Sequence, residues 1–191
     1  MAEQKIDDVE IVVENQNSPF LIRPENAEKI MSAILHYFGL SHCSVHVSFV
    51  SEEEILSLNS EYREKKRSTD VLSFPQLEWR SPLTRDWSDS CASPYDRCED
   101  GQIMDGVPVC LGDIIISPEN AKRNAVDIGQ SLDQELCFLM VHGILHLFGH
   151  DHIEPSDEEA MLKEQRQMMS YLESRESEPA WKGLLSEAES V

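Results

Sequence analysis

The chain has 191 residues, of which 40% are hydrophobic and 27% are charged. This composition excludes an intrinsically disordered chain, and the length suits one globular domain with a single core. The 36 acidic residues outnumber the 16 basic ones and give a formal net charge of −20. Such a charge excludes a protein that coats nucleic acid through a broad basic surface.

Alternating and helical apolar patterns predict the elements of the first half of the chain. They are a strand near residue 9, a helix from Pro24 to about Phe38, a strand over 44–51, a short helix from Ser51 to Arg63, and a strand over 69–75. Proline in the first turn and Gly39 after the last turn mark the ends of the first helix. The three glutamates after Ser51 favour that serine as the N-cap of the second helix.

The second half contains one long irregular segment and several apolar ones. Residues 76–107 are polar, rich in turn-forming residues and without sustained periodicity, which predicts a long loop or an extended hairpin insertion. After it we expect a strand over 107–117, a short helix ending near Gly129, a helix over 131–149 and a last helix over about 155–172. The whole forms one domain over 1–175. An acidic tail over 176–191 follows, either as a loose end or as a short docked turn.

The helix over 131–149 carries the clearest local signals. Ser131 can cap its N-terminus, Gln134 stands at the capping-box position, and Gly149 is a natural C-terminal stop. The helix is apolar on nearly every side, which is typical of a buried central helix. Its longest apolar run, around residues 136–149, holds two histidines and is shorter than the roughly 18 apolar residues of a membrane span. The chain's start lacks a signal-peptide pattern. We therefore expect a cytoplasmic protein without a membrane partner.

Three histidines at the end of this helix form a candidate metal site. His142 and His146 are four residues apart, so they project from one helix face and can hold one ion. Gly149 permits the chain to fold back and bring His152 to the same ion. One histidine in an apolar helix is more often a core residue than a ligand, but two would both need buried partners. Three neutral imidazoles leave a tetrahedral Zn²⁺ with an open position, which predicts one catalytic zinc per chain.

The residues around these histidines leave some assignments open. His150 competes with His152 as the third ligand, although the spacing favours His152, and Asp151 is placed to orient a ligand imidazole. In zinc peptidases a glutamate follows the first histidine as general base, and here Gly143 holds that position. Glu135 lies on the same helix face, where it either approaches the metal or has a capping or solvated role.

Three ordered segments resemble the signatures of one protein family. His142-Gly-Ile-Leu-His146-Leu-Phe-Gly-His-Asp-His152 resembles the HGxLHLxGxDH signature of the YbeY family, the bacterial ribosome-maturation endoribonucleases. Asn59-Ser-Glu-Tyr-Arg63 with the segment 69–75 resembles the family's NxxYR…TDVLSFP block, and Leu111-Gly-Asp-Ile-Ile-Ile-Ser117 resembles its LGDIxIS strand. The resemblance covers about residues 45–170. The chain departs from the family pattern in the insertion at 76–107, in the acidic tail and at His150, where the family often has tyrosine.

The resemblance implies both a fold and a function. The fold is a zincin-like α+β single domain, with a mixed sheet of about four strands packed with about five helices and a central helix that carries the metal ligands. The function is that of a zinc-dependent, single-strand-specific endoribonuclease in 16S rRNA 3′-end maturation and ribosome quality control. The implied partners are single-stranded rRNA, the small ribosomal subunit and ribosomal proteins.

Basic residues before the third predicted strand are candidates for contact with RNA. Arg63 matches the family's arginine, and the resemblance implies that it binds the scissile phosphate or its developing charge. The alternative is an ordinary solvated arginine. Lys65, Lys66 and Arg67 follow and form a strong basic cluster in an acidic chain. This cluster is either a solvated turn or the place where an RNA backbone binds.

Two other functions remain as alternatives. The general zincin resemblance favours a metal-dependent hydrolase of peptides or amides, and Gly143 disfavours it. In the other alternative the protein is a non-enzymatic ribosome-assembly factor whose metal only stabilises the fold. RNA cleavage that disappears in His146→Ala excludes the assembly factor, whereas peptide turnover without RNA cleavage favours the peptidase.

Overall fold

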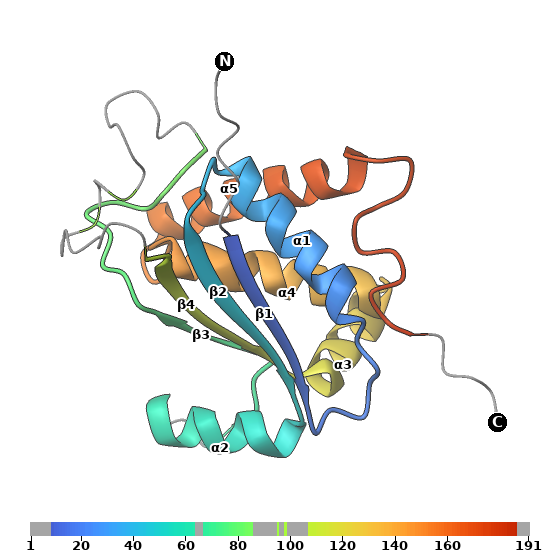
Figure 1. Cartoon of the computed structure of the whole chain (residues 1–191). Helices are drawn as coiled ribbons and strands as arrows, with labels where there is room; N and C mark the ends of the chain where they lie inside the picture. Colours follow the sequence, from blue (N-terminus) through green and yellow to red (C-terminus); the bar gives the residue numbers. More distant parts are fainter. Residues whose placement is uncertain (1–8, 64–66, 86–94, 96–97, 99–106, 187–191) are drawn as a thin grey trace.

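The structure, a computed structural model, describes residues 9–63, 67–85, 95, 98 and 107–186, and within them a four-stranded sheet lies against helices (Figure 1). The strands are β1 (Val9–Gln16), β2 (Cys43–Val50), β3 (Val71–Pro75) and β4 (Val109–Ile116). The helices are α1 (Pro24–Tyr37), α2 (Glu52–Arg63), α3 (Pro118–Ile128), α4 (Leu132–Leu147) and α5 (Pro155–Ser174). The predicted α+β class, the mixed sheet and the helix set are confirmed.

The sheet has the strand order β1-β2-β4-β3. β1 and β2 pair in parallel, β2 and β4 pair in parallel, and β3 runs antiparallel to β4. Parallel neighbours need a crossover connection, which α1 supplies between β1 and β2. The alternation in β2 buries Cys43, Val45, Val47 and Phe49 in the core.

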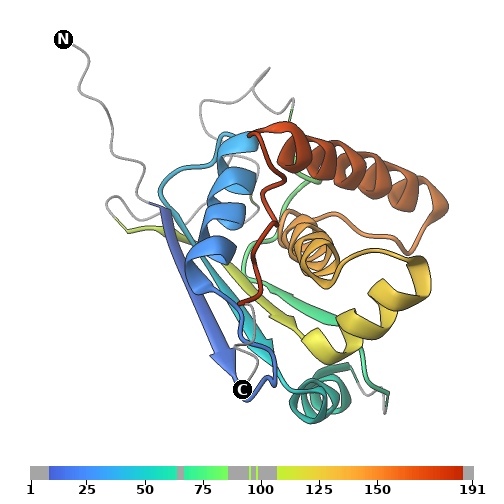
Figure 2. The same cartoon turned by 90° about the vertical axis from the view of Figure 1, so that its right-hand side faces the viewer.

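Helices α1, α4 and α5 lie on one face of the sheet, with α4 in the middle (Figure 2). α4 contacts β3, β4 and three other helices, and its residues Leu136, Met140, Val141 and Ile144 have no exposed surface. The central position predicted for this helix is therefore confirmed. Its N-cap is also as predicted, because the Ser131 side chain accepts a hydrogen bond from the Gln134 backbone N–H at 3.2 Å. Among the described helices, none combines the length and the apolarity needed to cross a bilayer.

The described part of the segment 76–107 lies across the C-terminal end of α4. The Trp79 indole N–H donates to the Leu147 carbonyl at 2.7 Å, and the Leu83 backbone N–H donates to the Phe148 carbonyl at 2.9 Å. The Leu83 side chain is fully buried. The described part of this segment thus covers the helix end that carries the candidate metal ligands, while residues 86–94, 96–97 and 99–106 lie outside the described part of the chain.

The segment after α5 returns to the core as a docked turn. Leu184 is fully buried and Trp181 nearly so. The backbone N–H groups of Gly183 and Leu185 donate to the Asp133 carboxylate in the first turn of α4, at 3.0 and 3.1 Å. The described residues of this segment, up to 186, are therefore docked against α4, and residues 187–191 lie outside the described range.

Candidate metal centre

The structure brings the three predicted histidines together at one end of α4. His142 and His146 stand one turn apart on that helix, and His152 follows its C-terminal reversal. One ring nitrogen from each lies within 4.8 Å of the others. The ring centroids are 4.7 Å apart for His142 and His146, and 5.2 Å apart for His146 and His152.

A tight turn after α4 places His152 beside the other two imidazoles. Gly149 has a φ of 82°, the left-handed conformation that favours glycine, and the His150 backbone N–H donates to the Leu145 carbonyl at 3.0 Å. The Asp151 carboxylate accepts hydrogen bonds from the backbone N–H groups of His152 and Ile153, at 2.5 and 3.0 Å. These contacts are with the backbone that carries His152, whereas the sequence interpretation placed Asp151 against an imidazole.

The hydrogen bonds of two imidazoles determine which nitrogen faces the cluster. His146 Nδ1 lies 2.9 Å from the His150 carbonyl oxygen, and His142 Nδ1 lies 3.4 Å from Gln165 Oε1. Because these oxygens can only accept, each Nδ1 carries a proton and each neutral ring keeps a lone pair on Nε2. The two Nε2 atoms are 3.1 Å apart, so their lone pairs repel each other unless a cation lies between them.

The donor set fits Zn²⁺. Imidazole nitrogens bind zinc at about 2.0–2.1 Å, which in tetrahedral geometry separates two of them by roughly 3.3 Å. Burial lowers the pKa of His142, and burial together with the neighbouring His142 lowers the pKa of His146 to about 4. Both rings are therefore neutral at physiological pH, the form in which imidazole binds a metal.

Gln165 is a contact of this cluster that the sequence interpretation missed. It lies on α5 with 3% of its surface exposed, and its amide oxygen holds the His142 ring. The apolar spacing of α5 predicts only a helix with one buried face. A glutamine beside a histidine from another helix is visible only once the two helices are packed together.

His150 has a different environment from the three clustered histidines. It is 4% exposed, and its Nε2 donates to the Leu83 carbonyl of the covering insertion at 2.8 Å. Burial lowers its pKa, so this ring too is neutral. Its described contacts thus favour a packing role under the insertion, and His152 as the third ligand.

We expect His150→Ala to destabilise the fold by about 1–3 kcal/mol, because it removes a buried hydrogen bond and leaves the Leu83 carbonyl unpaired. Its metal content should stay at the wild-type value. The matched variant His152→Ala removes an exposed side chain and should lose the metal with little change in the stability of the metal-free chain. Urea denaturation with chelator, beside metal analysis, measures both. Metal loss from His150→Ala and retention by His152→Ala would reverse the assignment.

The predicted RNA-binding residues lie only partly within the described chain. Arg63 closes α2, and its side chain, with Lys65 and Lys66, lies outside what the structure describes. Arg67 is exposed. Its backbone carbonyl accepts a hydrogen bond at 2.7 Å from Asn59, a residue 2% exposed on α2. Asn59 therefore ties the end of the basic segment to the helix before it.

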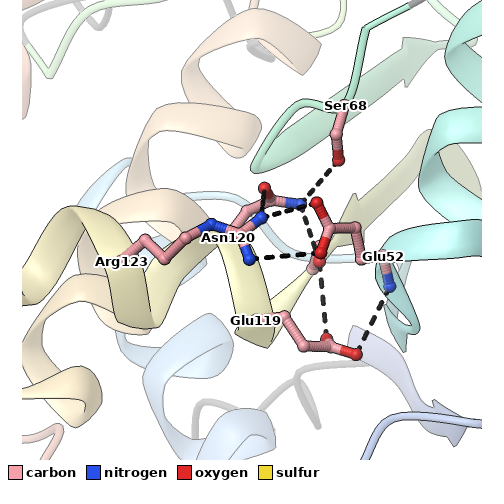
Figure 3. A network of polar contacts seen from close by, with 6 residues as sticks. Glu52, Ser68, Glu119, Asn120 and Arg123 are labelled. Carbon is pink, nitrogen blue, oxygen red and sulfur yellow. Dashed lines mark hydrogen bonds and ion pairs between the residues drawn. The ribbon is translucent and has the colours of Figure 1, made fainter.

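A second set of polar contacts holds the next residue of that segment (Figure 3). The Asn120 amide donates to the Ser68 hydroxyl at 2.8 Å. Arg123 donates to both carboxylate oxygens of Glu52, at 3.1 and 2.6 Å, and this contact lowers the pKa of Glu52. The network joins the starts of α2 and α3 to the approach to β3. Because its charges are largely exposed, the network contributes little to the free energy of folding, and its main effect is to position the segment before β3.

Two residues of α4 bear on the peptidase alternative. Glu135 is 3% exposed and accepts a hydrogen bond from Gln130, and burial raises its pKa. It is absent from the group of described residues that can share one ion. A Cβ added to Gly143 would lie 2.6 Å from Ile114 Cγ2 of β4. The position that holds the general base in zinc peptidases therefore faces the sheet, where a side chain requires Ile114 to shift.

The known proteins that this chain resembles in sequence belong to one family. The family model described as endoribonuclease YbeY matches residues 12–173. The endoribonuclease YbeY of Exiguobacterium sibiricum is 36% identical over 154 residues, which are 78% of this chain and 88% of the relative. That of Agathobacter rectalis is 39% identical over 147 residues, 76% of this chain and 86% of the relative. A solution structure from Thermotoga maritima covers 83% of this chain and 85% of its own at 24% identity, and its TM-score of 0.52 supports the fold.

Proposed function

Since this chain belongs to the endoribonuclease YbeY family, we propose that it is a zinc-dependent enzyme that cleaves single-stranded RNA. His142, His146 and His152 would hold the ion. One observation carries this proposal: two neutral imidazoles present their lone pairs to each other across 3.1 Å, an arrangement that a bound cation stabilises. Such a cluster has no use in a nuclease that works by side chains alone.

When bound, Zn²⁺ supplies Lewis acidity toward an oxygen of the reacting phosphodiester or of water. The chain's own groups orient the ligands. Gln165 and the His150 carbonyl fix the ring planes of His142 and His146, and the Asp151 carboxylate fixes the backbone of His152. Arg63 would bind the scissile phosphate and offset the negative charge that grows on it.

The physiological substrate we propose is ribosomal RNA, at the 3′ end of 16S rRNA within the small ribosomal subunit, in the cytoplasm. Lys65, Lys66 and Arg67 would contact the RNA backbone. A chain with a net charge of −20 attracts RNA weakly, so ribosomal proteins of the subunit would supply part of the affinity. Quality control of ribosomes follows from the same activity on exposed single strands.

The test offers the zinc-loaded chain four substrates: a single-stranded RNA, the same RNA as a duplex, the matching DNA strand and an unstructured polypeptide. We expect cleavage of the single-stranded RNA alone. Polypeptide turnover without RNA cleavage would establish the hydrolase alternative. No turnover of any substrate, even with small ribosomal subunits added, would contradict the proposal and favour the assembly-factor alternative.

We expect Arg63→Glu to reduce RNA cleavage by about 100-fold or more, because it replaces a charge that stabilises the transition state by one that repels the phosphate. Zinc content should stay unchanged. Lys29→Glu makes the same charge reversal at an exposed position of α1, beside β1, and serves as the control. Normal cleavage by Arg63→Glu would remove this residue from the site.

A further inference from the structure

A cavity of about 340 Å³ lies between α4 and α5, and two of its lining residues, Phe138 and Gln165, contact His142 of the histidine cluster. Phe138 of α4 lines it, and the same i, i+4 row of that helix continues to His142 and His146. The Phe138 ring lies nearly parallel to the His142 ring, at 17° with centroids 6.4 Å apart. The cavity and the metal ligands therefore share one face of α4.

Gln165 lines the cavity and also contacts the cluster. Its amide oxygen lies 3.4 Å from His142 Nδ1, whereas its amide Nε2 is buried without a hydrogen-bond partner among the described residues. A buried N–H donor without a partner is costly, and native proteins seldom leave one. This amide points to a ligand with a hydrogen-bond acceptor.

The surface of the cavity is mostly apolar, although Ser170 and Glu173 also line it. Met169 and the largely buried Trp181 contribute apolar surface, and Leu162 keeps 41% of its surface exposed. Arg166, an exposed residue of α5, brings a planar cation. An isolated phosphate or carboxylate does not suit apolar walls. A flat ring with acceptors on its edge suits both the walls and the amide.

We propose that the α4–α5 cavity binds one nucleobase of the RNA strand that is cut at the histidine cluster. The base would lie against Phe138 and accept a hydrogen bond from the Gln165 amide, with Arg166 stacking or donating at the rim. Proteins that bind single strands commonly hold unstacked bases this way. The inference rests on the proposed function, and a bound base would add affinity for RNA to that of the short basic segment.

The test measures binding of a nine-nucleotide 2′-O-methyl RNA with a fluorescent end to the zinc-loaded protein, with a gel to check that the probe stays intact. A series of probes removes one base at a time. In wild type, one abasic position should weaken binding by about 5- to 100-fold, the effect expected for one stacked base. In Phe138→Ala, the abasic substitution at the same position should weaken binding by less than about twofold, because the aromatic ring that contacts the base is absent. Arg166→Glu should weaken the intact probe more than Lys163→Glu, a matched charge reversal at another exposed residue of α5.

Each outcome decides the inference. An abasic penalty of equal size in wild type and Phe138→Ala would overturn it, as would equal effects of Arg166→Glu and Lys163→Glu. If Phe138→Ala does not fold, the exposed pair Arg166→Glu and Lys163→Glu carries the test alone. If the wild-type protein cuts single-stranded RNA and no single abasic position weakens binding, this inference is wrong and the proposed function stands. Wild type that neither binds nor cuts RNA would remove both.

Discussion

His146→Ala releases the metal and lowers cleavage of single-stranded RNA by about 10³-fold or more, as removal of a central catalytic group does. His146 is the middle residue of the cluster, with its Nε2 3.1 Å from that of His142 and its ring centroid 5.2 Å from that of His152. Two remaining imidazoles bind zinc too weakly to keep it at working concentrations. Metal analysis and a gel assay of RNA cleavage, made on the same preparation, measure the two losses together.

The control for this variant is His150→Ala, which removes an imidazole four residues away that bonds to the insertion instead. It should keep both metal and cleavage, apart from its loss of stability. RNA cleavage that persists in folded, zinc-free His146→Ala would show that the reaction does not run through this cluster.

Gly143→Ala lowers the free energy of unfolding by about 1–3 kcal/mol, because the added methyl overpacks a dense core. Its Cβ would lie 2.6 Å from Ile114 Cγ2 and 3.2 Å from the Cγ1 and Cδ1 atoms of the same side chain. Gly143→Glu, which would restore the general base of a zinc peptidase, should fail to fold because it also buries a carboxylate. Urea denaturation curves of wild type and the alanine variant give the difference.

The matched control is Gly143→Ala in an Ile114→Ala background, where the obstructing side chain is absent. The cost of the glycine substitution should fall by most of its value there, as a double-mutant cycle measures. Equal costs in both backgrounds would mean that α4 does not press against β4 at this point. One structural objection to the peptidase alternative would then be removed.

Local signals were enough to predict the elements and the clustering of the three histidines. Proline at Pro24, Ser51 and Ser131 at helix starts, and glycines at 39 and 149 act over one turn of chain, so the element boundaries follow from them closely. The histidine cluster is local in the same sense. One helical turn joins His142 to His146, and a single glycine reversal brings in His152.

The rest depends on contacts between distant parts of the chain. The strand order places β4 between β2 and β3, although β3 precedes it in sequence, and alternation in a strand does not say which neighbour it will pair with. Gln165 reaches His142 from another helix, and Asn59 holds the Arg67 carbonyl across a loop. Polar residues on an amphipathic helix look alike in sequence. The few that position a site can therefore be identified only from the packed structure.

The measurement that tests the central claim most directly is a zinc titration of the metal-free wild-type chain, followed by single-stranded RNA cleavage at each step. The account predicts that cleavage is absent without metal, rises in proportion to bound zinc and reaches its maximum at about one ion per chain, as three histidines in one cluster require. Full cleavage by the metal-free chain, or a maximal cleavage rate reached without an ion at this cluster, would contradict it.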